Sequence, residues 1–160
     1  MLLAYHGDPA VKQKYQDRVR QHAEADQIVQ GYGYWSDGKG CAVGCTIHGS
    51  SHAAYEVEIG VPRLIARLED CIFEGLPIDE AKTWPSRFLD TIPLGADLSA
   101  VWPQFAYWLL VDAEHGVLRH AKTDRTRKAI TDVAAMYQRW IDGCKPSADE
   151  WRAAAAAAAA

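Results

Sequence analysis

The chain has 160 residues, of which 49% are apolar and 24% are charged, and its formal net charge is −4 at pH 7. These fractions are typical of a globular protein with a sizeable core, and the modest acidic charge disfavours a nucleic acid or a membrane surface as partner. The sequence has no run of 18 apolar residues, so no membrane span is expected. The first residues, MLLAYHGDPAVKQKY, have no basic start and only a short apolar run. We therefore expect no signal peptide and a cytoplasmic protein with reduced thiols.

The first predicted element is a long helix over residues 9–30. Asp8 and Pro9 are a typical N-cap and first helical residue, and Gly31 is a typical C-terminal stop. Val11, Tyr15, Val19 and His22 recur at helical spacing and are expected to form its buried stripe.

Two further helices are expected after residue 52. The first is short, covers 52–59 and ends at a glycine, and the second follows Pro62 and is amphipathic over 62–75. The periodicity of the second helix places Cys71 in the apolar core face and Glu69 on the opposite, solvent-facing side.

The remainder of the chain also shows helical patterns. Two short helices are expected between Pro77 and Pro93, and the strongly apolar segment 99–111 is predicted to be the central buried helix. A long amphipathic helix is expected over 124–142. The basic cluster at 119–128 precedes it and lacks interleaved aromatics, which favours a solvated face over a phosphate-binding site.

These patterns predict an all-α protein with about seven helices in a single domain over 1–146, interrupted by one glycine-rich irregular loop. Ser147-Ala148-Asp149-Glu150 forms a capping box that should open a last, alanine-rich helix or tail over 147–160. Alanine is the strongest helix former but offers little surface for specific packing.

The most unusual stretch is 31–52, which reads GYGYWSDGKGCAVGCTIHGSSH and contains six of the twelve glycines. Its first half alternates glycines with aromatic residues, which is typical of an irregular loop with exposed side chains. Exposed aromatics on such a loop suit partner recognition. The first hypothesis is therefore a non-catalytic interaction module. Its candidate binding residues are Tyr32, Tyr34, Trp35, Lys39, His52 and Glu56.

The second half of the stretch suggests a metal-binding or thiol-based protein as the alternative. Cys41, Cys45, His48 and His52 are spaced as one face of a helix, and two thiolates with two imidazoles are a ligand set for zinc or iron. Along a continuous helix, however, the first and last of these residues lie about 16 Å apart. The spacing also matches no strong zinc signature.

The same residues have a structural interpretation. Gly40 and Gly44 lie beside Cys41 and Cys45 and would give a smooth helix face against which another helix can pack, and free cysteine behaves as a small hydrophobe. Cys41, near the start of the short helix and beside Lys39, is also a candidate nucleophile. Both interpretations remain open at the level of sequence.

A third hypothesis is an enzyme with a polar pocket. His48, His52, Glu56 and Glu58 could supply acid/base groups, and His52 and Glu56 are spaced to pair across one helical turn. No Ser-His-Asp order, phosphate-binding loop or dinucleotide fingerprint is present. This leaves catalysis uncertain and favours a protein without it.

Four motifs resemble those of an uncharacterised family of bacterial and phage-encoded proteins. They are KGCAVGCTIHG (39–49), YEVEIGVP (55–62), LIARLEDCIFEGLP (64–77) and IPLGADL (92–98). The resemblance covers most of residues 5–152. Members of that family tend to continue into an alanine-rich tail and have no established activity, so the resemblance implies no catalytic residues. Its phage-related setting implies an interaction or accessory protein with an unidentified protein partner, and the alanine tail could pack against a second copy.

Overall fold

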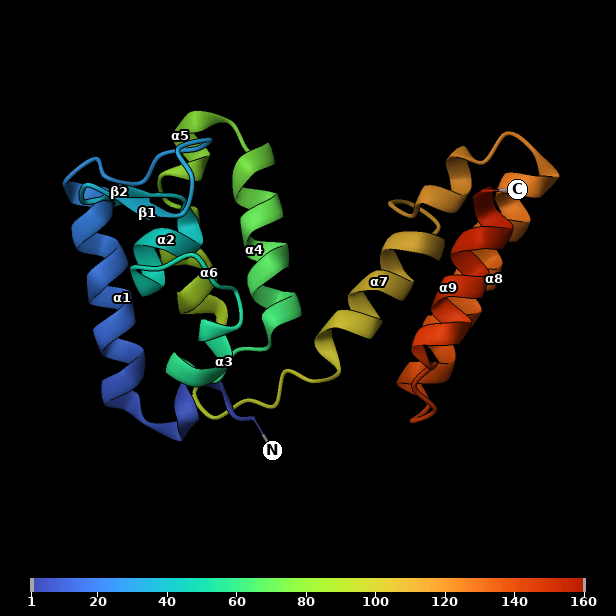
Figure 1. Cartoon of the computed structure of the whole chain (residues 1–160), viewed down its shortest axis with the longest axis horizontal. Helices are drawn as coiled ribbons and strands as arrows, with labels where there is room; N and C mark the ends of the chain where they lie inside the picture. The colour runs from blue at the N-terminus through green and yellow to red at the C-terminus, as the bar shows by residue number, and fades with distance from the viewer. Residues whose placement is uncertain (1, 160) are drawn as a thin grey trace. The chain divides into compact units, whose positions relative to one another are not determined.

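The computed structural model describes residues 2–159 and is shown in Figure 1. Met1 and Ala160, the outer limits of the two predicted ranges, lie outside the described residues. The all-α class is confirmed, with nine α-helices, two 3-10 helices and one hairpin of two very short strands in the described part. None of these helices is long and apolar enough to cross a membrane.

The chain divides into two compact units, residues 1–99 and 100–160. The predicted boundary at residue 146 lies inside the second unit, just before α9 (Ala148–Ala159), which contacts α8 (Asp124–Ile141). The helices also number more than the expected seven or so.

The first unit contains the hairpin and most of the short helices. Its elements are η1 (Ala4–Gly7), α1 (Pro9–Glu24), β1 (Trp35–Ser36), β2 (Lys39–Gly40), α2 (Ala42–Ile47), α3 (Ala54–Glu58), α4 (Arg63–Gly75), α5 (Ile78–Ala81) and α6 (Trp84–Thr91). All six residues of α2 are buried, and α2 contacts α1, α4 and α6 (Figure 1). The second half of the glycine-rich stretch is therefore the centre of this unit.

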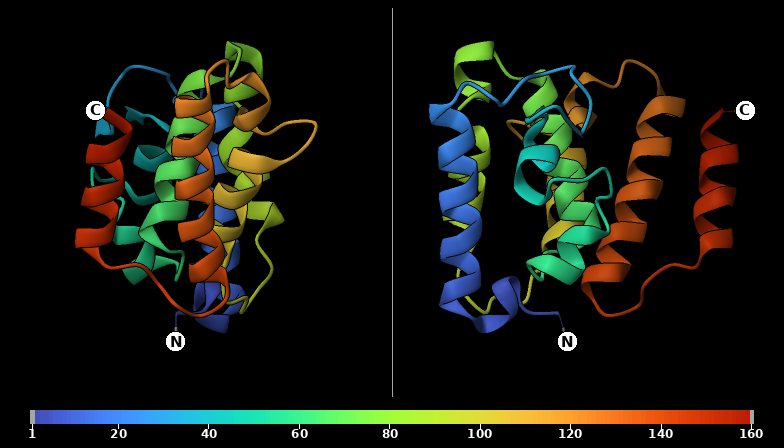
Figure 2. Two further views of the ribbon diagram at one scale, coloured as in Figure 1. Left: turned by 90° about the vertical axis from the view of Figure 1, so that its right-hand side faces the viewer. Right: turned by 60° about the vertical axis from the view of Figure 1, so that its left-hand side comes forward.

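The second unit consists of α7 (Val101–Val111), η2 (Val117–His120), α8 (Asp124–Ile141) and α9 (Ala148–Ala159). Helix α8 contacts both α7 and α9, and it lies between them in the left view of Figure 2. The predicted capping box is confirmed, because the Glu150 amide donates to Ser147 Oγ at 3.2 Å and the Ser147 amide donates to Glu150 Oε2 at 2.8 Å.

The prediction that 99–111 is the central buried helix is wrong. Only Pro103 and Ala106 of α7 are buried, while Trp108 and Leu109 are 40% and 41% exposed. The apolar composition of a helix does not reveal which other elements pack against it, and burial depends on those elements. The central position belongs instead to α2, which is short and built from small residues.

The first helix begins as predicted but ends earlier. Asp8 Oδ1 accepts the Ala10 amide at 2.8 Å, as expected of an N-cap, yet α1 ends at Glu24 and not near residue 30. Asp26 adopts a left-handed backbone with φ of 53°, and the chain then turns into a bridge between Ile28 and Gly40. Because the bridge depends on a distant residue, the sequence near residue 24 gives no sign that the helix ends there.

Helix α4 buries a different face from the one predicted. Its buried residues are Ile65, Ala66, Glu69 and Phe73, and Cys71 is exposed. The prediction placed Cys71 in the core and Glu69 on the solvent-facing side, and the structure reverses both positions. The energetic reason that a carboxyl can occupy this face is its hydrogen bond to a buried tyrosine, described below.

Candidate functional site

The exposed part of the glycine-rich stretch is a hairpin. Strands β1 and β2 pair in antiparallel register, and the two residues between them, Asp37 and Gly38, have φ of 50° and 77°. Two positive φ values in a two-residue loop are typical of a type I′ turn, for which Asp-Gly is a preferred sequence. The parallel bridge of Ile28 to Gly40 ties the hairpin to the chain that leaves α1.

The hairpin is seated on α2 through a close backbone approach. A Cβ atom added to Gly40 or to Gly44 would overlap the Tyr34 carbonyl oxygen. The two glycines were expected to admit a neighbouring helix. They are needed instead because the backbone of the loop lies directly against them, where any side chain would displace it.

Hydrogen bonds at both ends hold the loop in place. The Gly31 amide donates to Glu74 Oε2 at 2.9 Å, which attaches the start of the loop to α4. The Cys41 amide donates to the Gly33 carbonyl at 2.9 Å, and the Gly40 amide is also bonded to the chain after α1. The backbone from residue 31 to residue 41 is therefore fixed at several points.

The aromatic side chains of this fixed loop reach solvent. Tyr32 is 44% exposed and Tyr34 is 36% exposed, Lys39 is exposed, and Trp35 is half-buried. We call these four residues, Tyr32, Tyr34, Trp35 and Lys39, the hairpin surface. Two of them, Trp35 and Lys39, lie on the strands of the hairpin, and the two tyrosines lie in the segment that leads into it.

Trp35 is half-buried because it stacks on a histidine. Its ring lies 4.1 Å from that of His48 with 16° between the planes, and His22 of α1 meets both rings edge-on at 5.0 Å. The two histidines share a contact of 2.8 Å between their Nε2 atoms. His22 Nδ1 lies 2.6 Å from Gln27 Oε1. Trp35 is thereby attached both to α1 and to the end of α2.

The surroundings of His48 disfavour its protonated form. Partial burial of the ring, followed by the positive charge of Arg18 and the proximity of His22, lowers the pKa of His48 below its usual value near 6.5. His48 has φ of 51° and ends α2 in the left-handed region. Sequence analysis assigned this residue to a metal site and missed His22, because nothing in the sequence links positions 22 and 48.

The structure does not bring the predicted metal ligands together. Cys45 Sγ donates to the Gly40 carbonyl at 3.3 Å, Cys41 lies beside Asp70, and His48 contacts the other histidine. Within residues 2–159, no three His, Cys, Asp or Glu side chains converge as a metal site would require. None of these residues is therefore assigned as a metal ligand.

The two thiols are also poorly suited to nucleophilic chemistry. Cys41 and Cys45 are 2% and 0% exposed. Burial raises the pKa of each thiol to about 12, so both are protonated at neutral pH. This agrees with their interpretation as core residues of α2 and its N-cap.

The predicted His52–Glu56 pair is not formed. His52 Nε2 lies 3.1 Å from Asp70 Oδ2, and the His52 ring meets the Tyr34 ring edge-on. Glu56 Oε1 accepts the Arg63 amide at 2.9 Å and so caps the start of α4. His52 thus contacts the hairpin surface through Tyr34, while Glu56 binds the first amide of α4.

Sequence analysis also missed a buried acid. Glu69 is fully buried, and its Oε2 accepts the Tyr55 hydroxyl at 2.6 Å. Burial raises the pKa of Glu69 to about 8, so the carboxyl is largely protonated at neutral pH. Because its partner is the buried hydroxyl of Tyr55, we assign Glu69 to the core and not to a reaction.

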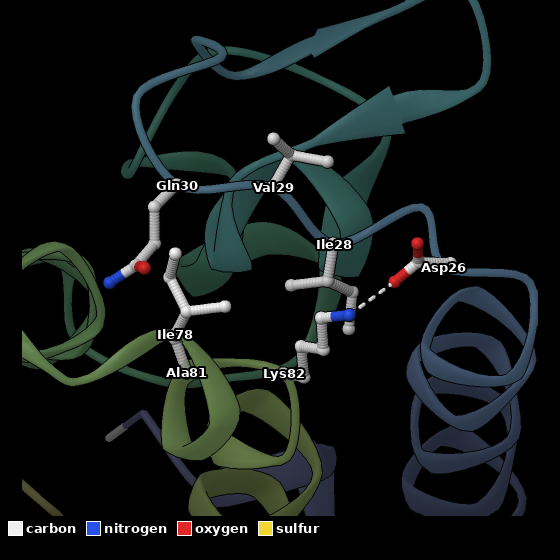
Figure 3. Close-up of a pocket in the computed structure, with 7 residues that line it drawn as sticks. All are labelled: Asp26, Ile28, Val29, Gln30, Ile78, Ala81 and Lys82. Carbon is white, nitrogen blue, oxygen red and sulfur yellow. Dashed lines mark hydrogen bonds and ion pairs between the residues drawn. The ribbon is translucent and has the colours of Figure 1, made fainter.

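A hollow of about 240 Å³ lies beside the loop that leads into the hairpin (Figure 3). Its polar groups already have partners: Lys82 Nζ binds Asp26 Oδ1 at 2.7 Å, and Gln30 Nε2 donates to the carbonyls of Phe73 and Leu76 at 2.6 and 2.9 Å. Figure 3 shows the ion pair at one end and the amide at the other. Because the charged and amide nitrogens of the lining are bonded within the protein, we assign no ligand to this hollow.

Comparison with known proteins adds no functional information. No family model, no curated protein and no solved structure matches the chain.

Proposed function

We propose that this protein is a non-catalytic interaction module that binds a protein partner through the hairpin surface. The observation that carries the proposal is the combination of a fixed backbone with exposed aromatic side chains. Tyr32 and Tyr34 are exposed, while the chain between them and on either side is held by hydrogen bonds and by the glycine contact.

A fixed loop lowers the entropic cost of association, because little conformational freedom is lost on binding. Tyrosine, tryptophan and basic residues are common at the energetic centres of protein interfaces. Lys39 directly follows the hairpin turn and adds a positive charge to the surface. The buried thiols, whose pKa values are raised to about 12, give the thiol-based alternative no comparable support.

The test compares three forms of the full chain. They are the natural protein, the double variant Tyr32→Ala/Tyr34→Ala, and the control Val57→Ala, which removes an apolar side chain that is 79% exposed on α3. Proteins captured by the natural chain from its source cells are purified and their dissociation constants measured directly. We expect the double variant to weaken binding by about thirtyfold or more, as loss of an interface centre does, and the control to bind normally.

The proposal fails if the purified partner binds the double variant as tightly as the natural chain. Circular dichroism of all three forms checks that the substitutions leave the helices intact.

A further inference from the structure

The contact between His22 and His48 has an unusual geometry. The Nε2 atoms lie 2.8 Å apart and the ring centroids 5.0 Å apart, so the two imidazoles meet almost end to end. At this distance a proton must lie between the two nitrogens. Gln27 Oε1 is an acceptor, so His22 carries its proton on Nδ1 and its Nε2 accepts the Nε2–H of His48.

This arrangement can hold one additional proton but not two. With one positive charge, the nitrogens can still share a donor and an acceptor. With two, both Nε2 atoms are N–H donors with no acceptor between them, and two like charges face each other at hydrogen-bond distance in an exposed contact. The second proton therefore breaks the contact.

The charged groups around the pair do not relieve this conflict. Arg18 of α1 adds a further positive charge near His48, and its guanidinium donates to the Thr46 carbonyl at 2.8 Å. Glu58 of α3 is the negative group that acts on His48, but its carboxylate already accepts the Tyr15 hydroxyl at 2.5 Å. Trp35 and Gln27, which pack on the pair from the loop side, are uncharged.

We infer that the His22–His48 pair is an acid-sensitive latch on the segment 31–40. The latch is closed while the pair carries at most one proton beyond the two of its neutral rings, and the joined rings then form the surface on which Trp35 stacks. The second proton separates the rings, removes that surface and releases the segment from α1 and α2. The release itself is independent of any partner, and only its consequence for binding rests on the proposed function.

The sign of the effect follows from the charge balance. Because the closed state binds the second proton less readily than separated histidines do, the closed state is stable above the ordinary histidine pKa near 6.5 and is lost as the pH falls below it. The lowered pKa of His48 agrees with this direction.

The test measures amide hydrogen exchange of the full chain by NMR between pH 7.5 and 4.5, corrected for the intrinsic pH dependence of exchange. The probes are the amides of Gly40 and Cys41, which donate to the carbonyls of Gln27 and Gly33. We expect their opening equilibrium to rise about tenfold for each pH unit below the pKa of the second proton, while amides in the middle of α4 remain protected.

Two variants separate the latch from general acid effects. His22→Gln cannot take up a charge, so its loop amides should stay protected to lower pH. His115→Gln removes a histidine that lies beside Trp108 in the second unit, and it should behave as the natural chain does. The latch is ruled out if both ring titrations of the natural chain are independent and ordinary, or if its loop protection does not change with pH.

Discussion

The carbonyl oxygen of Tyr34 occupies the space in which a side chain of Gly44 would begin. This single contact places the exposed hairpin directly on the most buried helix of the first unit. The buried Gly44 therefore helps to fix the position of the exposed Tyr34 side chain.

We therefore expect Gly44→Ala to destabilise the protein and to displace the hairpin. The new methyl group meets backbone atoms, which cannot move aside without breaking the loop, so the cost should lie at the upper end of the roughly 1–3 kcal/mol that overpacking causes. Urea unfolding measures this change. Gly75→Ala is the matched control, because a Cβ at Gly75 meets nothing within 4 Å. An equal effect of both substitutions would contradict the role of the close approach.

Glu69 should make stability depend on pH. Its pKa is about 8 in the folded chain against an ordinary value of 4.5, so the folded state holds a proton that the unfolded state loses. The contribution of Glu69 to stability should therefore be greatest below pH 4.5 and fall as the pH rises toward 8, by about 1.4 kcal/mol for each pH unit in that window. In Glu69→Gln this contribution should vanish, since the amide oxygen can still accept the Tyr55 hydroxyl.

The measurement is the free energy of unfolding at several pH values between 5 and 8. The difference between Glu69→Gln and the natural chain should grow steadily across that range. Glu80→Gln, at an exposed position of α5, should leave the pH dependence unchanged. A constant difference between Glu69→Gln and the natural chain would show that the carboxyl is ionised throughout.

The four thiols should fall into two classes of reactivity. Cys71 and Cys144 are exposed and should react with a disulfide reagent at once, while Cys41 and Cys45 are buried with pKa values near 12 and should react only on unfolding. Mass spectrometry of the labelled peptides identifies the class of each thiol. Rapid labelling of Cys41 in the native chain would show that α2 opens far more readily than its burial implies.

The first unit should fold alone. Its interior contains the largest fully buried side chains, among them Tyr5, Tyr55, Ile59 and Phe73. A fragment of residues 1–99 is expected to keep a cooperative urea transition. In that fragment, Phe73→Ala should cost about 3–5 kcal/mol, as truncation of a buried aromatic ring does. A fragment without a cooperative transition would show that this core needs residues beyond 99.

Local signals in the sequence predicted much of the fold. The caps at Asp8 and Ser147 and the proline at position 62 placed helix starts correctly, because capping depends on a few neighbouring residues. The Asp37-Gly38 turn carries an equally local signal, and sequence analysis could have recognised the hairpin from it.

The features that sequence analysis missed all depend on contacts between distant residues. The early end of α1 follows from a bridge to Gly40, and the burial of Glu69 follows from its bond to Tyr55. The pairing of His22 with His48 crosses 26 positions. Periodicity within one helix contains no information about such partners, so it assigned His48 to a neighbouring cysteine pair instead.

The hairpin turn is the position in the first unit where an insertion should disturb the fold least. Asp37 and Gly38 form the tip, and a Cβ at Gly38 would meet only the end of the Gln27 side chain, while the strands behind the tip are fixed by Gly40 and Gly44. Inserted foreign peptides should thus be tolerated between residues 37 and 38 but not within the strands, between 35 and 36 or between 39 and 40. The chain offers a graft site whose orientation is set in advance by its own core.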